Sequence, residues 1–562
     1  MNGDNCDNGE YKVDFDKPIH TPTRKLKVIC IGAGASGLLI AYKLQRHFDD
    51  FELNVYEKNK DVSGTWYENR YPGCACDVPS HCYTWSFEPK TDWSSTYASA
   101  KEIHQYFAGF AKKYQLGRYI KLEHEVIGAT WDEAAAQWHV KIRQGTTEIL
   151  VEDSCHVLLN AGGILNAWKW PAIPGLENYK GTLVHSAAWP EDLDLTGKVV
   201  GLIGNGSSGV QILPAIQAEV KELTTFIREP TWIAPPLGEA YQVFTDADKA
   251  SFAADPEKHL VLRRGIESGI NSAFAMFTLA DGRQKEIRTA FEDRMRQQLS
   301  DPRTAHFQNA LIPTWSVGCR RLSPGIDYLK SLSAPNVSVV FGNITHVTSA
   351  GCVMSSGEEY PTDVLICATG FDTSLRPRFP VIGRAGVDLR EKWKDEPRAY
   401  LGFAAAGFPN YLMTLGPNCP IGNGAVLAGI EAQVEYFVKL LSKFQKEMLT
   451  TFDVREEAVD DFVEHKDEFM KNTVWTEDCR SWYKGDNIHG KVTALWPGSS
   501  LHYIEAVREV RYEDWALTRE KRNRFQFLGN GHSTAEKRTG EMAYYIRNSD
   551  DSWIDPVLKA KL

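Results

Sequence analysis

Two neighbouring cations and a distant carboxylate are the side chains best suited to chemistry. Arg320 and Arg321 follow residues 315–319, a glycine-bearing apolar loop in which two adjacent charges are hard to explain by solubility. A guanidinium keeps its charge at any ordinary pH, so one arginine can hold a phosphate while the other stabilises a reacting anion. The alternative is a solvated pair. Asp77 needs a charged partner if its site is dry.

Asp77 closes the loop of residues 63–77, which contains two glycines, a proline and three large aromatic residues. Flat side chains suit a flat ring system, and glycines allow a ligand to approach the backbone closely. The loop begins six residues after Glu57. We interpret it as a ligand-contacting loop; the alternative is a packed aromatic loop without a ligand.

A dinucleotide-binding fingerprint precedes this loop. Residues 26–31 predict a buried strand that runs into Gly32-Ala33-Gly34-Ala35-Ser36-Gly37 and a helical segment. In G-x-G-x-x-G the glycines make the turn, admit the pyrophosphate and pack helix on strand, and the helix N-terminus faces the phosphate. The next strand, residues 52–56, ends at Glu57, which lies 20 residues after Gly37 and can bind a ribose.

A second fingerprint has the opposite charge at the ribose position. Residues 198–203 precede Gly204-Asn205-Gly206-Ser207-Ser208-Gly209, and the following strand, residues 222–227, ends in Arg228. A cation there favours the 2′-phosphate of NADP, whereas the adjacent Glu229 opposes it. An acidic site followed by a basic one predicts FAD and then NADPH, and two such units usually pass a hydride between their ligands.

These patterns predict an α/β protein with two Rossmann-like dinucleotide-binding domains, for FAD and NADP, and an inserted helical subdomain. Residues 179–190 are interpreted as a linker between domains. The expected divisions are 1–24 (flexible N-terminal tail), 25–170 (first segment of the FAD-binding domain), 171–235 (first segment of the NADP-binding domain), 236–312 (helical insertion), 313–392 (second segment of the NADP-binding domain) and 393–562 (second segment of the FAD-binding domain and C-terminal region).

Bulk properties exclude several classes of function. The 562 residues carry a net charge of -10, so nucleic acid is not expected as a partner. No apolar run approaches the ~18 residues of a transmembrane helix. The 11 cysteines are odd in number and scattered without pair spacing, which favours a reducing, cytoplasmic location. No histidine cluster suggests a metal site. We expect a monomer or a weak oligomer.

Two further motifs make the pattern specific. They are Gly64-x-Trp66 through Tyr71-Pro72-Gly73-x-x-x-Asp77, and Gly181-x-x-x-His185-x-x-x-Trp189-Pro190. With these the chain resembles the Baeyer–Villiger monooxygenases, the single-component, FAD-containing, NADPH-dependent class B flavin monooxygenases. Relatives that oxygenate amines and sulfides have a similar second motif without Trp-Pro. Residues 368–372, 416–418 and 481–483 also match, so the resemblance covers about residues 25–515.

The resemblance implies roles for individual residues. Arg321 is expected to be the catalytic arginine and Asp77 to hold it. Arg320 and Arg228 would contact the NADP phosphate, and Trp482 would lie on a mobile loop that closes on the nicotinamide half. His185 and Trp189 are expected to couple the domains. The other expected cofactor-binding residues are Gly32, Gly34, Gly37, Glu57, Thr65, Trp66, Tyr67, Tyr83, Val126, Gly204, Asn205, Gly206, Ser207, Ser208, Gly209, Gln211, Glu229 and Val426.

The implied activity is insertion of one oxygen atom of O2 next to a ketone carbonyl, through an anionic C4a-peroxyflavin and NADPH, to give an ester or lactone. Apolar residues of the insertion (Phe274, Met276, Phe277, Leu279) suggest a bulky hydrophobic ketone. The alternatives are a flavin monooxygenase that oxidises nitrogen or sulfur and a non-oxygenating NADPH-dependent flavin reductase. An NADP-binding regulatory module is disfavoured by Asp77 and Arg321.

Overall fold

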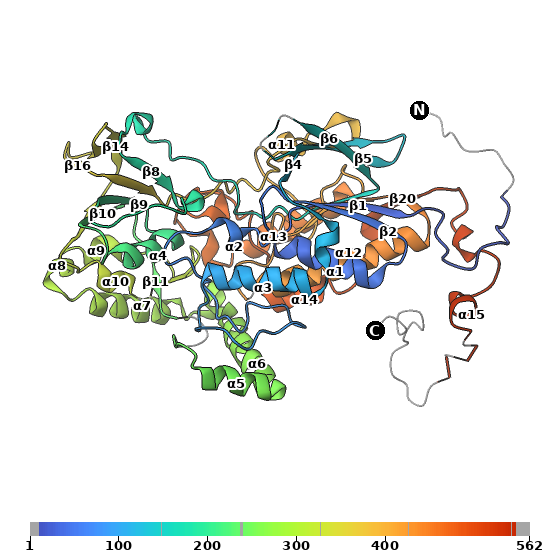
Figure 1. Ribbon diagram of the computed structural model, residues 1–562, viewed down its shortest axis with the longest axis horizontal. Coiled ribbons are helices and arrows are strands. Elements are labelled where there is room, and N and C mark those ends of the chain that lie inside the picture. The colour runs from blue at the N-terminus through green and yellow to red at the C-terminus, as the bar shows by residue number, and fades with distance from the viewer. Residues whose placement is uncertain are drawn as a thin grey trace.

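Two parallel five-stranded sheets, one in each half of the molecule, organise the chain (Figure 1). The computed structural model describes residues 11–546 except 146, 148, 237–239, 326, 425, 541 and 544. The first ten residues of the expected flexible tail therefore lie outside the described residues. The remainder of that segment packs on the C-terminal region of the chain, where Arg24 Nη2 donates to Leu449 O (2.7 Å) and Ile19 N to His532 O (3.0 Å).

The first sheet has the strand order β19-β7-β1-β2-β3, and all its pairings are parallel. Its central strand is an apolar run whose residues are nearly all buried, as expected for a strand covered on both faces. Helices α1 (Ala35–His47) and α12 (Val426–Lys446) pack together beside it. Because β19 and α12 come from the C-terminal region, both ends of the chain build this unit. The strands are β1 (Leu26–Ile31), β2 (Phe51–Tyr56), β3 (Ile120–Lys121), β7 (Val157–Asn160) and β19 (Tyr411–Met413).

The second sheet repeats the arrangement with the order β13-β10-β9-β17-β8, again with parallel pairings. Helix α4 (Ser207–Ile216) follows its central strand β9. The interpretation of residues 179–190 as a linker was wrong, because β8 forms an edge of this sheet beside β17. The α/β class with two Rossmann-like units is confirmed. The strands are β8 (Thr182–His185), β9 (Val199–Ile203), β10 (Glu222–Ile227), β13 (Val337–Phe341) and β17 (Val364–Cys367).

A helical region follows β10, as the sequence predicts. Its helices α5 and α6 extend away from the two sheets in Figure 1. Helix α6 contacts the first unit, because His259 Nε2 lies 2.9 Å from His81 Nδ1 and Arg263 Nη2 donates to Trp85 O (3.0 Å). The helices are α5 (Asp246–Ala254), α6 (Pro256–Ser272), α7 (Gln284–Gln298), α8 (Pro302–Ala305) and α9 (Gln308–Leu311).

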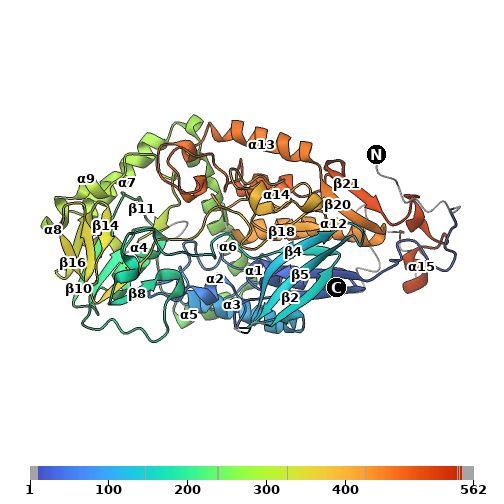
Figure 2. The same ribbon diagram turned by 90° about the horizontal axis from the view of Figure 1, so that it is seen from above.

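Smaller elements cover the two units, and helix α13 runs along one side of the molecule when it is seen from above (Figure 2). A four-stranded sheet has the order β18-β4-β5-β6, and a three-stranded sheet comprises β14, β15 and β16. The bounds are α2 (Thr65–Glu68), α3 (Ala100–Lys113), β4 (His124–Asp132), β5 (Gln137–Gln144), β6 (Leu150–Cys155), β11 (Ile233–Ala234), β12 (Ser323–Pro324), α10 (Tyr328–Ser331), β14 (Ile344–Val347), β15 (Gly351–Met354), β16 (Glu359–Pro361), β18 (Val381–Ile382), α11 (Leu389–Lys392), β20 (Leu449–Val454), α13 (Glu456–Met470), α14 (Ser500–Ala506), β21 (Trp515–Arg519) and α15 (Thr534–Arg538).

A disulfide joins Cys319 to Cys479, whose Cα atoms are 6.4 Å apart. No paired spacing in the sequence indicates this bridge, because its two cysteines are separated by 160 positions. The other described cysteines are buried and form no disulfide.

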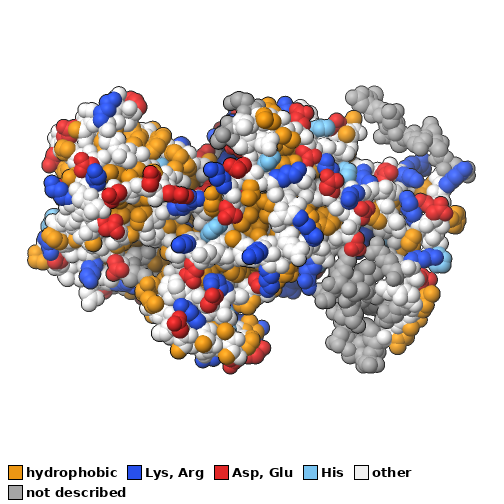
Figure 3. Space-filling model, in the orientation of Figure 1, with side chains coloured by type: hydrophobic (Ala, Val, Ile, Leu, Met, Phe, Trp, Pro, Cys, Tyr) orange, Lys and Arg blue, Asp and Glu red, His pale blue; other side chains and the backbone are white. Residues whose placement is uncertain are grey.

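Acidic and basic side chains are interspersed over the face shown in Figure 3. Among the described residues, none of the helices combines the length and the apolar character that a membrane crossing needs.

The buried histidine pair makes stability depend on pH. Burial, His259, Arg263 and Lys90 together lower the pKa of His81 to about 4. Because the folded-state pKa lies below the unfolded value of about 6.5, the unfolded chain binds the extra proton between these pH values. Stability should therefore be complete above pH ~6.5 and fall as the pH is lowered from there to about 4, by about 3 kcal/mol for this group.

Thermal unfolding of wild type and His81→Phe between pH 4 and 8 tests this expectation. Phenylalanine suits the aromatic neighbours Phe244 and Phe252 and cannot titrate, so the melting temperature of the variant should depend less steeply on pH. His139, which is largely exposed, supplies the control variant His139→Gln. Equal slopes for wild type and His81→Phe would contradict the assignment.

Candidate active site

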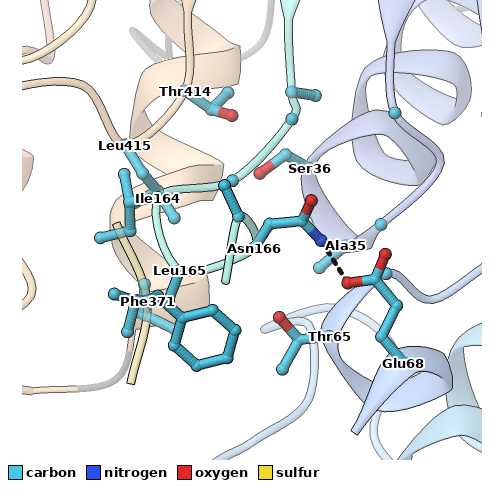
Figure 4. Close-up of a pocket in the computed structure, with 18 of the residues that line it drawn as sticks. Ala35, Ser36, Thr65, Glu68, Ile164, Leu165, Asn166, Phe371, Thr414 and Leu415 are labelled. Atoms are coloured by element: carbon cyan, nitrogen blue, oxygen red, sulfur yellow. Dashed lines mark hydrogen bonds between the residues drawn. The ribbon is translucent and has the colours of Figure 1, made fainter. Parts of the chain in front are cut away.

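A cavity of about 550 Å³ lies at the carboxyl ends of the first sheet and reaches the second unit. This volume is within the roughly 300–1,000 Å³ of ligand pockets in proteins. Figure 4 shows its wall, where Ala35 and Ser36 at the start of α1 lie near Asn166 and Asn166 donates to Glu68 of α2. Ligands of open α/β sheets bind at this end of the strands.

The first glycine-rich turn is built as the fingerprint predicts. Gly32 has φ +95°, which favours glycine, and a Cβ on Gly37 would lie 1.9 Å from Gly32 O. The Glu57 carboxylate, only 3% exposed, accepts hydrogen bonds from Ala33 N (2.7 Å) and Asn59 N (2.9 Å). Burial raises the pKa of Glu57. Gly32, Gly34 and Glu57 line the cavity, whereas Gly37 packs helix against strand.

The aromatic loop supplies the next section of the wall. Trp66 Nε1 donates to Tyr83 Oη (3.1 Å), and both side chains line the cavity. Thr65, Val126 and Val426 also line it. Tyr67 does not, because its ring stacks under Arg70, whose Cζ lies 4.3 Å from the ring centre. The expectation that Tyr67 contacts a cofactor therefore has no geometric support.

Asp77 and Arg321 meet at the cavity although they are 244 residues apart. Arg321 Nε donates to Asp77 Oδ2 (2.6 Å) and Nη2 to Oδ1 (2.8 Å), a bidentate pair, while Nη1 donates to Ile421 O (3.1 Å). The Asp77 carboxylate raises the pKa of Arg321 above its already high ordinary value. Three of the five guanidinium N–H groups are thus engaged, and the Tyr483 side chain interacts with the same guanidinium.

Helix α4 joins the second unit to this loop. Gln211, expected to bind cofactor, accepts a hydrogen bond from Tyr71 Oη (2.8 Å) and donates to Ala75 O (3.0 Å). A Cβ on Gly73 would lie 2.5 Å from Gln211 O, so this glycine of the Tyr-Pro-Gly motif lets helix and loop touch. Ser207, Ser208 and Gln211 line the cavity from the second unit. The two Rossmann-like units therefore meet at this loop.

The second glycine-rich turn repeats the first and reaches the cavity only through Ser207 and Ser208. Gly204 has φ +106°, and a Cβ on Gly209 would lie 2.1 Å from Gly204 O. Open space surrounds the Cβ position of Gly206, as a pyrophosphate approaching the backbone requires. Asn205 Nδ2 donates to Glu229 O (3.0 Å). Arg228, Glu229 and Arg320 form an ion-pair group at the end of β10, away from the cavity.

The predicted coupling residues belong to the second unit. His185, at the end of β8, stacks on Trp168 with ring centres 4.6 Å apart, and its Nε2 lies 3.4 Å from Thr369 Oγ1. Trp189 packs against the core of the second unit. Neither residue lines the cavity, and their role in domain coupling stays a prediction.

Sequence reasoning missed three residues that the structure brings to the sites. Glu68 and Asn166 line the cavity, and Arg480 joins the ion-pair group through Glu229. Glu68 lies inside the aromatic loop and Arg480 directly precedes Ser481-Trp482, so a search for charges beside the motifs could have found both. Trp482 also lines the cavity, and its place on a mobile loop stays a prediction.

The cavity fits a dinucleotide with a flat ring, because its turn, its carboxylate Glu57 and its aromatic loop are the elements that such a ligand needs. The comparisons agree. Residues 30–100 match the family model of an NAD(P)-binding Rossmann-like domain. The chain is 39% identical to the FAD-binding monooxygenase stcW of Emericella nidulans, over 97% of this chain and 93% of the relative.

Bacterial relatives and solved structures give the family. The chain is 34% identical to a Baeyer–Villiger monooxygenase of Streptomyces coelicolor, over 88% of this chain and 93% of the relative. Cyclohexanone monooxygenase from Rhodococcus sp. Phi1 bound to NADP+ is similar in structure, with a TM-score of 0.76, 27% identity and coverage of 89% and 100% of the two chains. The chain therefore belongs to the Baeyer–Villiger monooxygenase family: it is an FAD-containing flavoprotein monooxygenase that uses NADPH.

Proposed function

We propose that the enzyme inserts one oxygen atom of O2 next to the carbonyl of a hydrophobic ketone and releases an ester or lactone. The observation that carries this proposal is the bidentate Arg321–Asp77 pair, which fixes a permanently charged guanidinium in the wall of the cavity. Bound FAD, reduced by NADPH, supplies the electrons and the site of oxygen activation.

Arg321 suits a reaction in which the attacking oxygen is an anion. Its raised pKa means that it donates hydrogen bonds without giving up a proton, so it stabilises negative charge on oxygen and leaves the nucleophile unprotonated. Asp77 fixes both the direction and the field of the guanidinium. Oxidation of nitrogen or sulfur needs an electrophilic oxygen donor. A fixed cation stabilises such a donor less than it stabilises an anionic nucleophile.

Trp482 supports a closed site. It lines the cavity from the 3₁₀ turn Trp482–Lys484, and Ser481 caps that turn by accepting a hydrogen bond from Tyr483 N (3.3 Å). A large indole at this place excludes water, which strengthens the interactions of Arg321 with charge.

The cavity lining supports a hydrophobic substrate, but through residues other than those expected. Phe274, Met276, Phe277 and Leu279 are not among its lining residues. Phe277 stacks instead on Trp475, with ring centres 5.6 Å apart. The apolar wall is made by Ile164, Phe371, Leu375, Leu415 and Ile421.

Parallel turnover of a ketone and a thioether under 18O2 tests the proposed function. With cyclohexanone and methyl phenyl sulfide at equal concentrations, mass spectrometry should find a lactone carrying one 18O atom as the main product. A panel from cyclohexanone to steroid ketones then ranks substrates by size. Formation of sulfoxide without any ester across the panel would overturn ketone oxygenation. Rapid NADPH consumption with release of hydrogen peroxide alone would favour a reductase.

A further inference from the structure

Three arginines from three different segments surround the carboxylate of Glu229. Arg320 donates to Glu229 Oε2, Arg480 Nε donates to Oε1 (3.0 Å), and Arg228 Nε lies 3.9 Å from Oε1. Arg228 and Glu229 follow β10 in the second unit. Arg320 belongs to the segment that carries Arg321, and Arg480 to the segment that carries Trp482.

The charge of this group is unbalanced. Three guanidinium groups and one carboxylate leave a net charge of about +2. Burial opposes ionisation of Glu229, but its hydrogen bonds with Arg480 and Arg320 lower its pKa below the ordinary value, so the carboxylate stays charged. A phosphate monoester carries about −1.5 to −2 charge at neutral pH, which matches the excess.

The position of the group also points to a nucleotide phosphate. It lies where a cation beside the ribose recognises the 2′-phosphate of NADP, directly after the second strand of a Rossmann unit. Asn205 of the glycine-rich turn is tied to Glu229 O (3.0 Å). Arg320 Nε is buried and has no hydrogen-bond partner among the described residues, so this guanidinium keeps donor capacity for a ligand.

We propose that Arg480 is a ligand of the 2′-phosphate of NADPH, and that Glu229 holds it in place until the phosphate arrives. The contact between Arg480 and the 2′-phosphate would then serve two purposes. It would select NADPH over NADH, and it would dock the segment that carries Trp482. Arg480 is two residues from Trp482, and its Nη1 also donates to Asp486 O (3.0 Å) within the same segment. The proposal rests on the use of NADPH and not on the ketone reaction.

Glu229 and the disulfide act differently on the segments that carry Arg320 and Arg480. Cys479 precedes Arg480 and Cys319 precedes Arg320, so the bridge holds the two segments together whatever the ligand. Glu229 instead neutralises some of the positive charge of the group before NADPH binds. Because it repels a phosphate, its removal should strengthen phosphate binding even though it frees Arg480.

Nucleotide binding to the FAD-loaded protein separates the 2′-phosphate from the rest of the ligand. Isothermal titration calorimetry would compare adenosine 2′,5′-bisphosphate with 5′-AMP for wild type, Arg480→Gln, Glu229→Gln and the exposed-arginine control Arg303→Gln. We expect Arg480→Gln to weaken binding of the bisphosphate about 10-fold and binding of 5′-AMP less than about twofold. Glu229→Gln should strengthen binding of the bisphosphate about threefold or more. Arg303→Gln should match wild type.

Hydrogen exchange of residues 477–490, with the disulfide intact, tests the coupling. In Glu229→Gln the segment should exchange faster than in wild type and regain protection when the bisphosphate binds. In Arg480→Gln it should exchange faster with or without the nucleotide. Three results for Arg480→Gln would each overturn the proposal. They are an equal loss of affinity for both nucleotides, wild-type affinity for both nucleotides, and recovery of hydrogen-exchange protection when the bisphosphate binds. None of these readouts uses a ketone, so a failed ketone assay leaves them informative.

Discussion

Replacing Arg321 by alanine is expected to abolish ester formation while flavin reduction by NADPH continues at close to the wild-type rate. The guanidinium is already fixed on Asp77 by two hydrogen bonds, so it is aimed at the cavity without reorganisation. A preorganised donor to a developing oxyanion is commonly worth about 3–4 kcal/mol, which corresponds to a loss of about 10²–10³ in ester-forming turnover. Hydride transfer to the flavin builds no such anion beside Arg321.

Stopped-flow absorbance of the oxidised flavin under nitrogen measures reduction, and mass spectrometry measures ester in air. Arg321→Ala also strands the Asp77 carboxylate, so the double variant Arg321→Ala/Asp77→Ala is the matched control. It should be equally inactive with ketone, and its melting temperature should be higher than that of Arg321→Ala because no unpaired charge remains. Normal ester yield from either variant would remove Arg321 from the oxygenation step.

The two nucleotide units could be predicted because their signals are local. Strand, glycine-rich turn and helix follow one another within about twenty residues, so β1, α1, β9 and α4 were recognised near their true bounds. The turn geometry also depends on neighbours within the same fingerprint, as the contact between Gly37 and Gly32 shows. The Asp77–Arg321 pair was reached differently, through a family resemblance, because nothing in either segment specifies a partner 244 residues away.

Features that depend on contacts between distant parts of the chain could not be predicted from the sequence. Residues 182–185 form an edge strand only because β17, far along the chain, offers a parallel partner. The bridge between Cys319 and Cys479 joins segments without any characteristic spacing. The apolar residues of the insertion suggested a wall of the substrate pocket, but Phe277 stacks on Trp475 instead. In each case the structure is decided by a partner far along the chain, which leaves no signal in the segment itself.

Replacing Gly37 by alanine is expected to give a colourless protein. The new Cβ would lie 1.9 Å from Gly32 O, a backbone atom that cannot move without opening the turn. This turn precedes α1, whose N-terminus would face the pyrophosphate of bound FAD, so distortion of the turn should remove phosphate contacts together with the close packing of helix on strand. Absorbance of the purified protein should show less than about a tenth of the wild-type flavin content, since each ~1.4 kcal/mol lost weakens binding tenfold.

Two matched substitutions distinguish a local effect on the turn from a general effect of adding a methyl group. Gly109→Ala changes an exposed site in α3 where the Cβ meets nothing within 4 Å, so flavin content should be normal and stability should rise by about 0.5–1 kcal/mol. Gly209→Ala creates the same clash in the second unit, 2.1 Å from Gly204 O. That protein should remain yellow but lose reduction by NADPH, while dithionite still bleaches it. If Gly37→Ala purified with full flavin content, the first turn would not be the FAD pyrophosphate site, because a distorted turn cannot keep both its helix packing and its phosphate contacts.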